Sequence, residues 1–303
     1  MNSTPRPKIK AMGEFKVPKT AVNMRADVFL AKKYPDFTRS SLERLFDEHS
    51  VKIGSLPIKP SHKLKQAEKI KVDETVLKQA PAEISLSIIY QDDDVVVINK
   101  PEGILSHSKG VMNDEATVAS FIAPKLSREL TGNRAGIVHR LDRPTSGVIL
   151  TVKNRDAQNK IQKQFSQRKV KKTYIAIVEG VPELQEAVIE APIERNPKRP
   201  QTFRANADGK PATTQYKTVE SFSKSGKGYS LLELKPLTGR THQLRVHLSY
   251  IGHPIVGDHL YGRSGEHLYL HAISLELTLP TAGRRVFRVD LPSYFNDFMR
   301  KSK

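Results

Sequence analysis

The sequence predicts an α+β protein: a mixed, largely antiparallel sheet with flanking helices, preceded by a small α/β unit. Three observations predict this architecture. The chain has 303 residues, a length that suggests about two domains. Many short segments typical of strands follow residue 84, and they do not alternate strictly with helical segments as a parallel sheet would require. Residues 21–75 instead contain two helical patterns and a few short strands.

The composition narrows the class of protein. The chain has no cysteine, which excludes disulfides, thiol catalysis and cysteine-bound metals and fits a reducing compartment. No apolar run is long enough to cross a membrane, and the basic start has no apolar stretch behind it, so a secretory signal is not expected. The formal net charge of +18 favours a polyanionic partner such as nucleic acid. We therefore expect a soluble cytoplasmic protein without a membrane partner.

The first quarter of the chain divides into a tail, a small domain and a linker. Residues 1–20 are rich in Pro and Lys and are expected to form a mobile basic tail, and residues 76–83 are expected to form a linker. Between them, apolar spacing predicts a helix over residues 28–34, a second helix that includes Leu42, Leu45 and Phe46, and strands at 51–53 and 70–72. Thr38 or Ser40 can cap the second helix, and Ser40 with Glu43 has capping-box spacing.

Several cations of this small domain are candidates for binding RNA phosphates: Lys32, Lys33, Arg39 and Arg44. The stretch R-A-D-V-F-L-A-K-K-Y-P-D-F-T-R-S-S-L-E-R-L, then V-K-I-G and S-H-K-L-K, resembles the alpha-L RNA-binding motif of ribosomal and RNA-modifying proteins. Gly54 keeps the glycine that follows the first strand of the motif. Ser50 and the pair Ala67-Glu68 replace residues that are usually Gly and Gly-Asp. The resemblance implies that residues 21–75 bind RNA.

Residues 84–303 form the second predicted domain. Its expected helices cover residues 116–123, where Pro124 would end the helix, and 155–169, an amphipathic segment. Its expected strands cover residues 84–89, 95–98, 137–140, 148–152, 174–178, 214–219, 230–234, 275–279 and 286–289.

The sharpest local feature is the loop H-R-L-D-R-P-T-S-G at residues 139–147. Asp142 lies within three residues of His139, Arg140 and Arg143, and neighbouring positive charge favours the ionised form of a carboxylate. An ionised Asp in a cationic groove can act as a nucleophile. The alternative is a carboxylate in a surface salt bridge, and the loop taken alone favours that second interpretation.

A second polar segment reads T-G-R-T-H-Q-L-R-V-H-L at residues 238–248, followed by G-H-P-I-V-G-D at 252–258. Gly239 allows a sharp turn that leaves Arg240 free to reach a ligand. Apolar and polar residues alternate after Gln243, which suits a strand, but a helix start is also compatible, so the element stays open. Six of the ten histidines lie between His242 and His271, yet their spacing matches no zinc motif, and we expect no metal.

Together the two segments resemble the RluA-type pseudouridine synthases. The resemblance covers nearly all of residues 84–303. It includes N-K-P-E-G at 99–103, H-R-L-D-x-x-T-S-G, K-T-Y at 172–174, G-R-T-H-Q-L-R-V-H and L-H-A at 270–272, all in the family's order. An alpha-L motif before this catalytic domain is the familiar order in members that modify ribosomal RNA. The resemblance implies the pseudouridine synthase fold for this domain.

The resemblance also assigns roles. Asp142 matches the catalytic nucleophile, and Tyr174 matches the tyrosine that stacks on the target base. Arg240 matches the arginine that pairs with the catalytic Asp, and Arg140 the arginine that fills the space left by the flipped nucleotide. Four nearby residues are further candidates for contacting RNA: His139, Arg140, Lys172 and Gln243.

The implied reaction is the isomerisation of uridine to pseudouridine, in which the base is detached from the sugar and rejoined through carbon five. It involves no redox step and no donated group, so no cofactor is expected. From the domain order, large-subunit ribosomal RNA is the expected substrate, and transfer RNA is the alternative substrate. The alternative is a non-catalytic RNA-binding or ribosome-assembly factor, which has no reason to carry Asp142, Tyr174 and Arg240 together.

Overall fold

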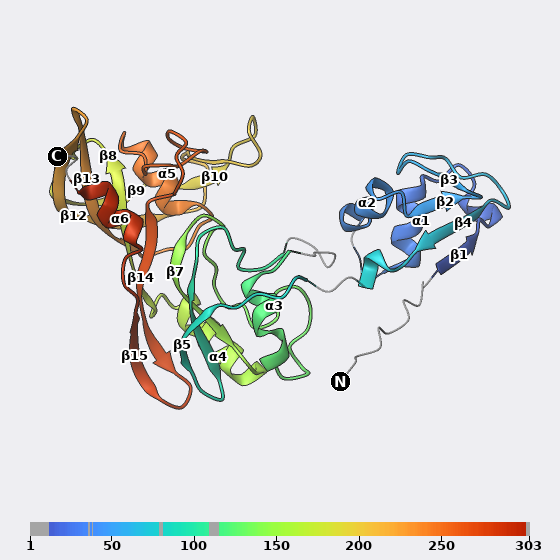
Figure 1. Cartoon of the computed structure of the whole chain (residues 1–303), viewed down its shortest axis with the longest axis horizontal. Helices are drawn as coiled ribbons and strands as arrows, with labels where there is room; N and C mark the ends of the chain where they lie inside the picture. The colour runs from blue at the N-terminus through green and yellow to red at the C-terminus, as the bar shows by residue number, and fades with distance from the viewer. Residues whose placement is uncertain (1–11, 36, 38, 79–80, 109–114, 301–303) are drawn as a thin grey trace, which may run out of the picture. The chain divides into compact units, whose positions relative to one another are not determined.

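The computed structural model describes residues 12–35, 37, 39–78, 81–108 and 115–300. The chain divides into two compact units, Met1–Glu83 with Ser108–Ala116, and Ile84–His107 with Thr117–Lys303. We call them the N-terminal and the C-terminal unit, and Figure 1 labels their helices and strands.

The N-terminal unit packs two helices against a four-stranded antiparallel sheet of order β1-β4-β2-β3. Leu42, Leu45 and Phe46 recur at helical spacing, so they share one face and are buried with Leu30 and Val72. The elements are β1 (Met12–Lys16), a 3₁₀ turn (Lys19–Ala21), α1 (Ala26–Lys33), α2 (Arg39–Asp47), β2 (Val51–Ile53), β3 (Leu56–Pro57), β4 (Lys69–Asp73) and a 3₁₀ turn (Val76–Lys78).

Two predictions for this unit are wrong. The expected mobile tail covered residues 1–20, but β1 pairs with β4 along its whole length, from Met12 opposite Asp73 to Lys16 opposite Lys69. Phe15 packs against the core, so apolar contact and the strand ladder together order this stretch. Residues 1–11 lie outside the described residues. Ser40 lies inside α2 and therefore is not its cap, and Thr38, the other predicted cap, lies outside the described residues.

The C-terminal unit is built on a nine-stranded sheet of order β5-β6-β7-β14-β8-β13-β12-β9, with β15 also paired to β14. A separate two-stranded ribbon joins β10 and β11. The strands are β5 (Ser87–Gln91), β6 (Val95–Lys100), β7 (Ser146–Val152), β8 (Lys171–Glu179), β9 (Glu186–Glu190), β10 (Ile193–Arg195), β11 (Phe203–Ala205), β12 (Thr213–Lys224), β13 (Lys227–Pro236), β14 (Leu270–Leu279) and β15 (Gly283–Arg288).

The large sheet is antiparallel except between β7 and β14. These two strands run parallel over only two residue pairs, His271 with Ser146 and Ala272 with Gly147. A Cβ atom at Gly147 would lie 2.2 Å from the carbonyl oxygen of Ala272, and the φ of Gly147 is 113°. Only glycine fits this position, because any side chain would overlap the neighbouring backbone. The parallel contact between β7 and β14, near the middle of the sheet, therefore lies at the end of the loop that carries Asp142.

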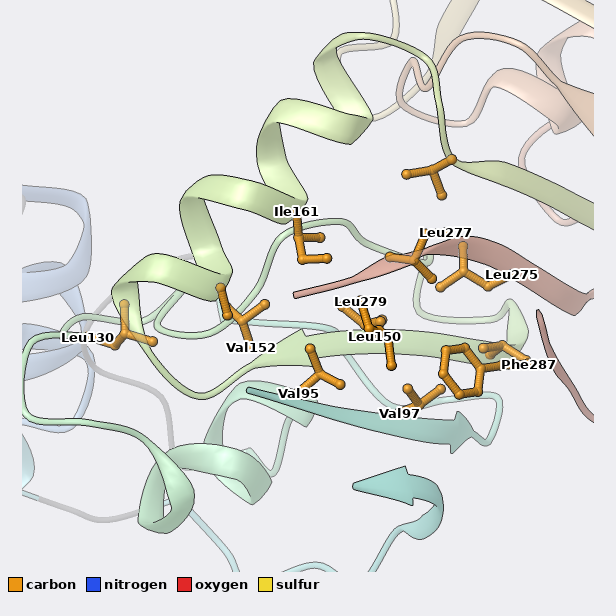
Figure 2. Close-up of a cluster of buried hydrophobic side chains, with 13 residues drawn as sticks. Val95, Val97, Leu130, Leu150, Val152, Ile161, Leu275, Leu277, Leu279 and Phe287 are labelled. Carbon is orange, nitrogen blue, oxygen red and sulfur yellow. The ribbon is translucent and has the colours of Figure 1, made fainter. Parts of the chain in front are cut away.

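Helix α4 covers one face of the sheet. Its inward residues Ala157 and Ile161 are buried with side chains of β6, β7, β14 and β15. Figure 2 shows Ile161 pointing from the helix toward Leu150, Leu277 and Leu279 of the sheet. The helices of the unit are α3 (Val118–Ile122), a 3₁₀ turn (Ala123–Lys125), α4 (Arg155–Ser166), α5 (Gln243–Tyr250) and α6 (Ser293–Met299).

The structure differs from the predictions for this unit in three places. Residues 137–140 form no strand beyond one bridge at Ile137, because the side chain of His139, not its backbone, accepts the hydrogen bond of Leu150 N–H. Helix α3 begins at Val118, later than the predicted residue 116, because Thr117 caps it; it ends before Pro124 as predicted, and the chain continues as a 3₁₀ turn. Strands β9 to β11 and helix α6 were not predicted, and residues 243–250, left open, are helical.

Candidate active site

Asp142 lies in a cavity of about 520 Å³ in the C-terminal unit. Four segments from distant parts of the sequence line it. They are the loop Val138–Asp142 with Thr145, the stretch from the end of α4 into β8 (Phe165, Ser166, Arg168, Val170, Lys172 and Tyr174), the segment Pro236–Arg245, and Leu270 of β14. The cavity therefore joins the two polar segments that stand about a hundred residues apart in the sequence.

Two side chains of the second segment face the Asp142 carboxylate. Oδ2 of Asp142 lies 3.6 Å from Nη1 of Arg245 and 3.9 Å from Nε2 of His242. The Asp142 side chain is 16% exposed, so it remains accessible from the cavity while its partners hold it in place. This is an oriented carboxylate in a partly desolvated site, an arrangement that a nucleophile or a base requires.

Arg245 is held by a second carboxylate behind it. Its Nε and Nη2 each donate a hydrogen bond of 2.7 Å to Asp258, whose side chain is fully buried. Its guanidinium also lies 5.1 Å from the ring centre of Tyr261. Burial opposes the charge of Arg245, but the hydrogen bonds and charge of Asp258, with the charge of Asp142, raise its pKa above the usual value. The bidentate pair fixes the plane of the guanidinium and leaves Nη1 for Asp142.

His242 reaches Asp142 because its backbone is left-handed, with φ 56°, at the start of α5. Its Nδ1 lies 2.8 Å from the hydroxyl of Tyr261, which accepts the backbone N–H of Phe203. Burial lowers the pKa of His242, and the charge of Asp142 opposes that shift only in part. The imidazole beside the carboxylate is therefore neutral near pH 7, and Arg245 supplies the positive charge.

Tyr174 and Lys172 enter the cavity from β8, two residues apart on the same face of the strand. Burial and the charge of Asp142 both raise the pKa of Tyr174, so the phenol stays protonated at neutral pH. Lys172 Nζ donates a 3.0 Å hydrogen bond to the carbonyl of Thr238, and burial lowers its pKa to about 8. The neutral ring offers a flat apolar surface with a hydroxyl donor beside the carboxylate.

The backbone of the Asp142 loop is clamped from both sides by the chain that follows β6. Ser106 Oγ donates to the carbonyl of Leu141 and accepts from Leu141 N–H. Lys100 is fully buried and donates to three carbonyls, those of Pro101, Ile104 and Arg143. The residues before and after Asp142 are thus fixed by two different side chains of one segment.

Two predicted site residues have other roles in the structure. Arg240 was expected to pair with Asp142, and this is wrong: it lines the cavity, but its Nε donates to the carbonyl of Pro211, and Arg245 takes the place beside the carboxylate. Gln243 was expected to contact RNA. It is buried instead, and its side-chain amide forms hydrogen bonds with Thr213, Thr214, Thr238 and the backbone N–H of Arg240.

The other candidates of the C-terminal unit line the cavity. Arg140 is exposed at the cavity and can reach a bound strand. His139 lines it too, but its Nε2 accepts the Leu150 N–H and its ring stacks on Phe165 at 4.9 Å. Burial and the charge of Lys172 lower the pKa of His139 to about 3, so this ring is neutral and structural.

The four cations predicted in the N-terminal unit lie on its two helices. Lys32 and Lys33 are exposed at the end of α1, and Lys33 Nζ lies 5.5 Å from the ring centre of Phe29. Arg39 lies 3.4 Å from Asp27, and Arg44 pairs with Glu48. The two lysines are thus the more available for phosphates.

Sequence reasoning missed Arg245, His242, Asp258, Lys100 and Ser106 as site residues. The sequence did point to Arg245, His242 and Asp258, because all three lie in the polar segments at 238–248 and 252–258. Lys100 also carried a signal, since it lies two residues after the apolar run Val95–Ile98 and in the N-K-P-E-G motif at 99–103. Within residues 12–300 as far as they are described, no group of three or more His, Asp or Glu side chains is arranged to hold a metal, and no helix has the length and apolarity to cross a membrane.

The comparison with protein families identifies the class of protein. Residues 94–250, which include the Asp142 loop, β8 and all of α5, match the RNA pseudouridylate synthase family. The chain belongs to this family and is an RNA pseudouridine synthase, an isomerase.

Curated relatives span nearly the whole chain. An uncharacterized RNA pseudouridine synthase of Aquifex aeolicus (strain VF5) is 36% identical, over 95% of this chain and 96% of its own. The ribosomal large subunit pseudouridine synthase D of Borreliella burgdorferi is 36% identical, over 96% and 93%. Among solved structures, the human RNA Pseudouridylate Synthase Domain Containing 1 has 29% identity and a TM-score of 0.56, over 70% of this chain and 85% of its own.

Proposed function

We propose that this protein isomerises uridine in large-subunit ribosomal RNA, with Asp142 as the residue that reacts. The observation that carries the proposal is the Asp142 carboxylate itself, held by Arg245 and facing a cavity of about 520 Å³ beside Tyr174. The choice of RNA is supported by relatives such as the Borreliella burgdorferi synthase, named for the large ribosomal subunit. A ribosomal substrate also agrees with the cytoplasmic location expected from the sequence.

The reaction needs an ionised carboxylate next to the target sugar. The bond between N1 of uracil and the sugar breaks, a bond from carbon five to the same sugar carbon forms, and the proton on carbon five leaves. Asp142 either attacks the sugar carbon or removes a neighbouring proton, and both routes use the oxygen that faces the cavity. All atoms except the exchanged proton stay in the product, so the chemistry itself calls for no oxidant, reductant or donor.

Tyr174 and Arg140 suit the handling of the base. The detached uracil has to turn while it stays bound, and the flat, neutral ring of Tyr174 can hold it against one wall. The uridine must first leave its stack, which costs a few kcal/mol. The exposed Arg140 at the cavity can enter the vacated space and offset part of this cost.

The N-terminal unit contributes to docking in this proposal. It resembles an RNA-binding motif in sequence, and Lys32 and Lys33 present cations at the end of α1. Contacts of this kind neutralise phosphates without reading the sequence of bases.

The direct test is the variant Asp142→Asn. The amide keeps the shape of the side chain but loses its charge, so we expect the rate of pseudouridine formation on unmodified large-subunit ribosomal RNA to fall by more than about 10³-fold. RNA affinity should change little. Pseudouridine is mapped on the RNA after incubation, and binding is measured by fluorescence anisotropy.

Asp208→Asn is the matched control, because Asp208 is an exposed carboxylate in the turn before β12 and outside the cavity. It should retain full activity. An active Asp142→Asn enzyme would remove Asp142 from the chemistry. Modification of transfer RNA in place of ribosomal RNA would keep the chemistry and refute the substrate.

A further inference from the structure

A groove of about 620 Å³ lies beside α4, outside the active-site cavity. Five of the side chains that line it are cations. We call it the cationic groove, defined by Lys160, Arg168, Lys169, Lys171 and Arg284. The rest of its lining is uncharged, from Gln164 of α4 and the chain between Thr278 and Pro280.

The floor of the cationic groove is held in place by tertiary contacts. The side-chain amide of Gln164 donates to the carbonyl of Thr278 at 2.7 Å and accepts from its N–H at 2.9 Å. Leu279 is buried beneath it in the same core that receives Ile161. These contacts join α4 to β14, so the cations project from a fixed surface and not from a mobile loop.

The charge of the cationic groove is only partly neutralised. Glu276 lies 2.7 Å from Arg284 and 3.5 Å from Lys171. In the described part of the chain, no ion pair involves the other three cations, Lys160, Arg168 and Lys169. A cluster of exposed like charges raises the local potential for an anion, and a row of phosphates relieves the repulsion.

The cationic groove meets the active-site cavity at Arg168. This residue lines both, and the turn from Phe165 to Val170 forms one wall of the cavity. A strand whose uridine enters the cavity therefore has its next phosphates within reach of the cations of the groove. This continuity favours RNA over an acidic protein as the occupant.

Arg168 also stands at a position that favours glycine. Helix α4 ends in a Schellman motif, in which Lys169 N–H bonds to the carbonyl of Gln164 and Arg168 N–H to that of Phe165. This motif places one residue after the helix in the left-handed conformation. That residue is Arg168, whose φ is 58°. Glycine adopts this conformation without steric cost, whereas arginine does not. A side chain kept against the local preference, at the junction of two cavities, points to a use for its charge.

We propose that the cationic groove binds the phosphates of the RNA strand that leaves the active site beside the target uridine. The inference rests on the proposed action on RNA, and it adds a second anchoring surface within the C-terminal unit. It predicts that short RNAs, which fill only the cavity, do not contact the cationic groove, whereas longer RNAs do.

The first test replaces two cations that line only the groove. The full-length variant Lys160→Ala with Lys169→Ala is titrated with a fluorescein-labelled oligouridylate of about 20 nucleotides. We expect the dissociation constant to rise about tenfold or more at 0.15 M salt, and the slope of log affinity against log salt to shrink by about 1.4, because about 0.7 is lost per phosphate contact on a single strand. A labelled tetranucleotide should bind the variant and the parent equally.

The second test uses Arg168→Gly, whose two readouts should move in opposite directions. Glycine relieves the left-handed strain, so Tm should rise by a few degrees, yet affinity for the same long oligouridylate should fall severalfold. A merely structural Arg168 would raise Tm and leave affinity unchanged, which would overturn the inference.

The matched control is Lys227→Ala with Arg288→Ala. Both residues are exposed on the same unit and line neither cavity, so the same charge is removed elsewhere. If the control pair weakens binding as much as the groove pair, or if the groove pair binds like the parent, the cationic groove is not an RNA site. If the parent forms no pseudouridine in any RNA while the groove pair still loses affinity, the proposed function fails and the binding surface stands.

Discussion

Lys100 is an unusual side chain for its position, because it is a lysine that is fully buried. A lysine buried at the end of an apolar strand is normally destabilising, yet its ammonium has three donors and finds three carbonyls. One of these carbonyls belongs to Arg143, the residue that follows Asp142. Lys100 therefore positions the Asp142 carboxylate through the backbone, and Lys100 does not line the cavity itself.

We predict a distinct pH signature for Lys100→Met. Burial lowers the pKa of Lys100 to about 7 in the folded protein, although the charges of Asp142 and Glu102 oppose the shift. Its ordinary value is 10.5, so the unfolded chain binds more protons between pH 7 and 10.5. The contribution of Lys100 to the free energy of unfolding thus rises with pH across this window, by up to about 1.4 kcal/mol per pH unit.

Lys100→Met should abolish this rise and also remove the donor from these carbonyls, two of which the neutral amine can still serve near pH 8, at a cost of about 2–4 kcal/mol at that pH. Urea denaturation of both proteins at a series of pH values measures the difference, in which Lys172 cancels because both proteins contain it. Parallel stability curves for the two proteins would show that Lys100 does not titrate in this window.

At this scale the sequence singled out Asp142 as the candidate but not the residues that hold it. Arg140 and Arg143 flank Asp142 in its loop, but the loop alone favoured a surface salt bridge, and the role of nucleophile came from the resemblance to the family. Arg245 did not stand out, because its position depends on α5: only a helix that begins at Gln243 turns Arg245 inward to Asp258. The sequence left this element open, and the resemblance to the family assigned the pairing with Asp142 to Arg240 instead.

Among the elements, the short parallel contact between β7 and β14 is the one that requires a residue without a side chain, at Gly147. It lies at the end of the loop that carries Asp142, so displacement of β14 would move the end of that loop. The side chain of Ser146 adds a 2.8 Å hydrogen bond to Nδ1 of His271 across the same pair of strands.

We predict that Gly147→Ala destabilises the protein by about 3 kcal/mol or more, because its Cβ would overlap the Ala272 backbone and its φ is unfavourable for alanine. Gly132→Ala is the control, since Gly132 has a φ of 88° and open space around the site of its Cβ. It should cost only about 1 kcal/mol. Thermal unfolding compares the two, and equal costs would mean that the close approach of β7 and β14 is not needed.

The elements best predicted from the sequence are those with strong periodicity, such as α4 and the buried run of β8. The missed ones lack it. Strand β9 has a single buried residue, Ile189, and β10 and β11 have three residues each, too few to show alternation. Strand β1 was hidden because prolines and lysines surround it in the sequence, although Phe15 and Val17, in and directly after the strand, alternate with polar residues.

Over the whole molecule, a net charge of +18 is distributed over two units with separate cores. The sequence predicted the two-part organisation from length and composition, but it could not show where cations gather in space. Lys160 and Arg284 are more than a hundred residues apart and meet in one groove only because β14 and β15 lie beside α4.

We predict that deleting residues 1–83 leaves a C-terminal unit that unfolds cooperatively, because its core contains no side chain from the N-terminal unit. Affinity for ribosomal RNA should fall about tenfold or more, and the salt dependence should weaken as phosphate contacts are lost. Anisotropy titrations at several salt concentrations measure both, with mapped pseudouridine as the readout of site choice. Unchanged affinity and unchanged sites would refute a docking role for the N-terminal unit.

The hydrogen bond between Ser146 and His271 joins residues 125 positions apart. Contacts of such long sequence separation form late, because the chain between them must be closed first. During translation, the loop that carries Asp142 emerges from the ribosomal exit tunnel well before the strand that supports it. The enzyme therefore acquires its activity only near the end of its own synthesis, and a nascent chain that ends before β14 has no competent catalytic centre.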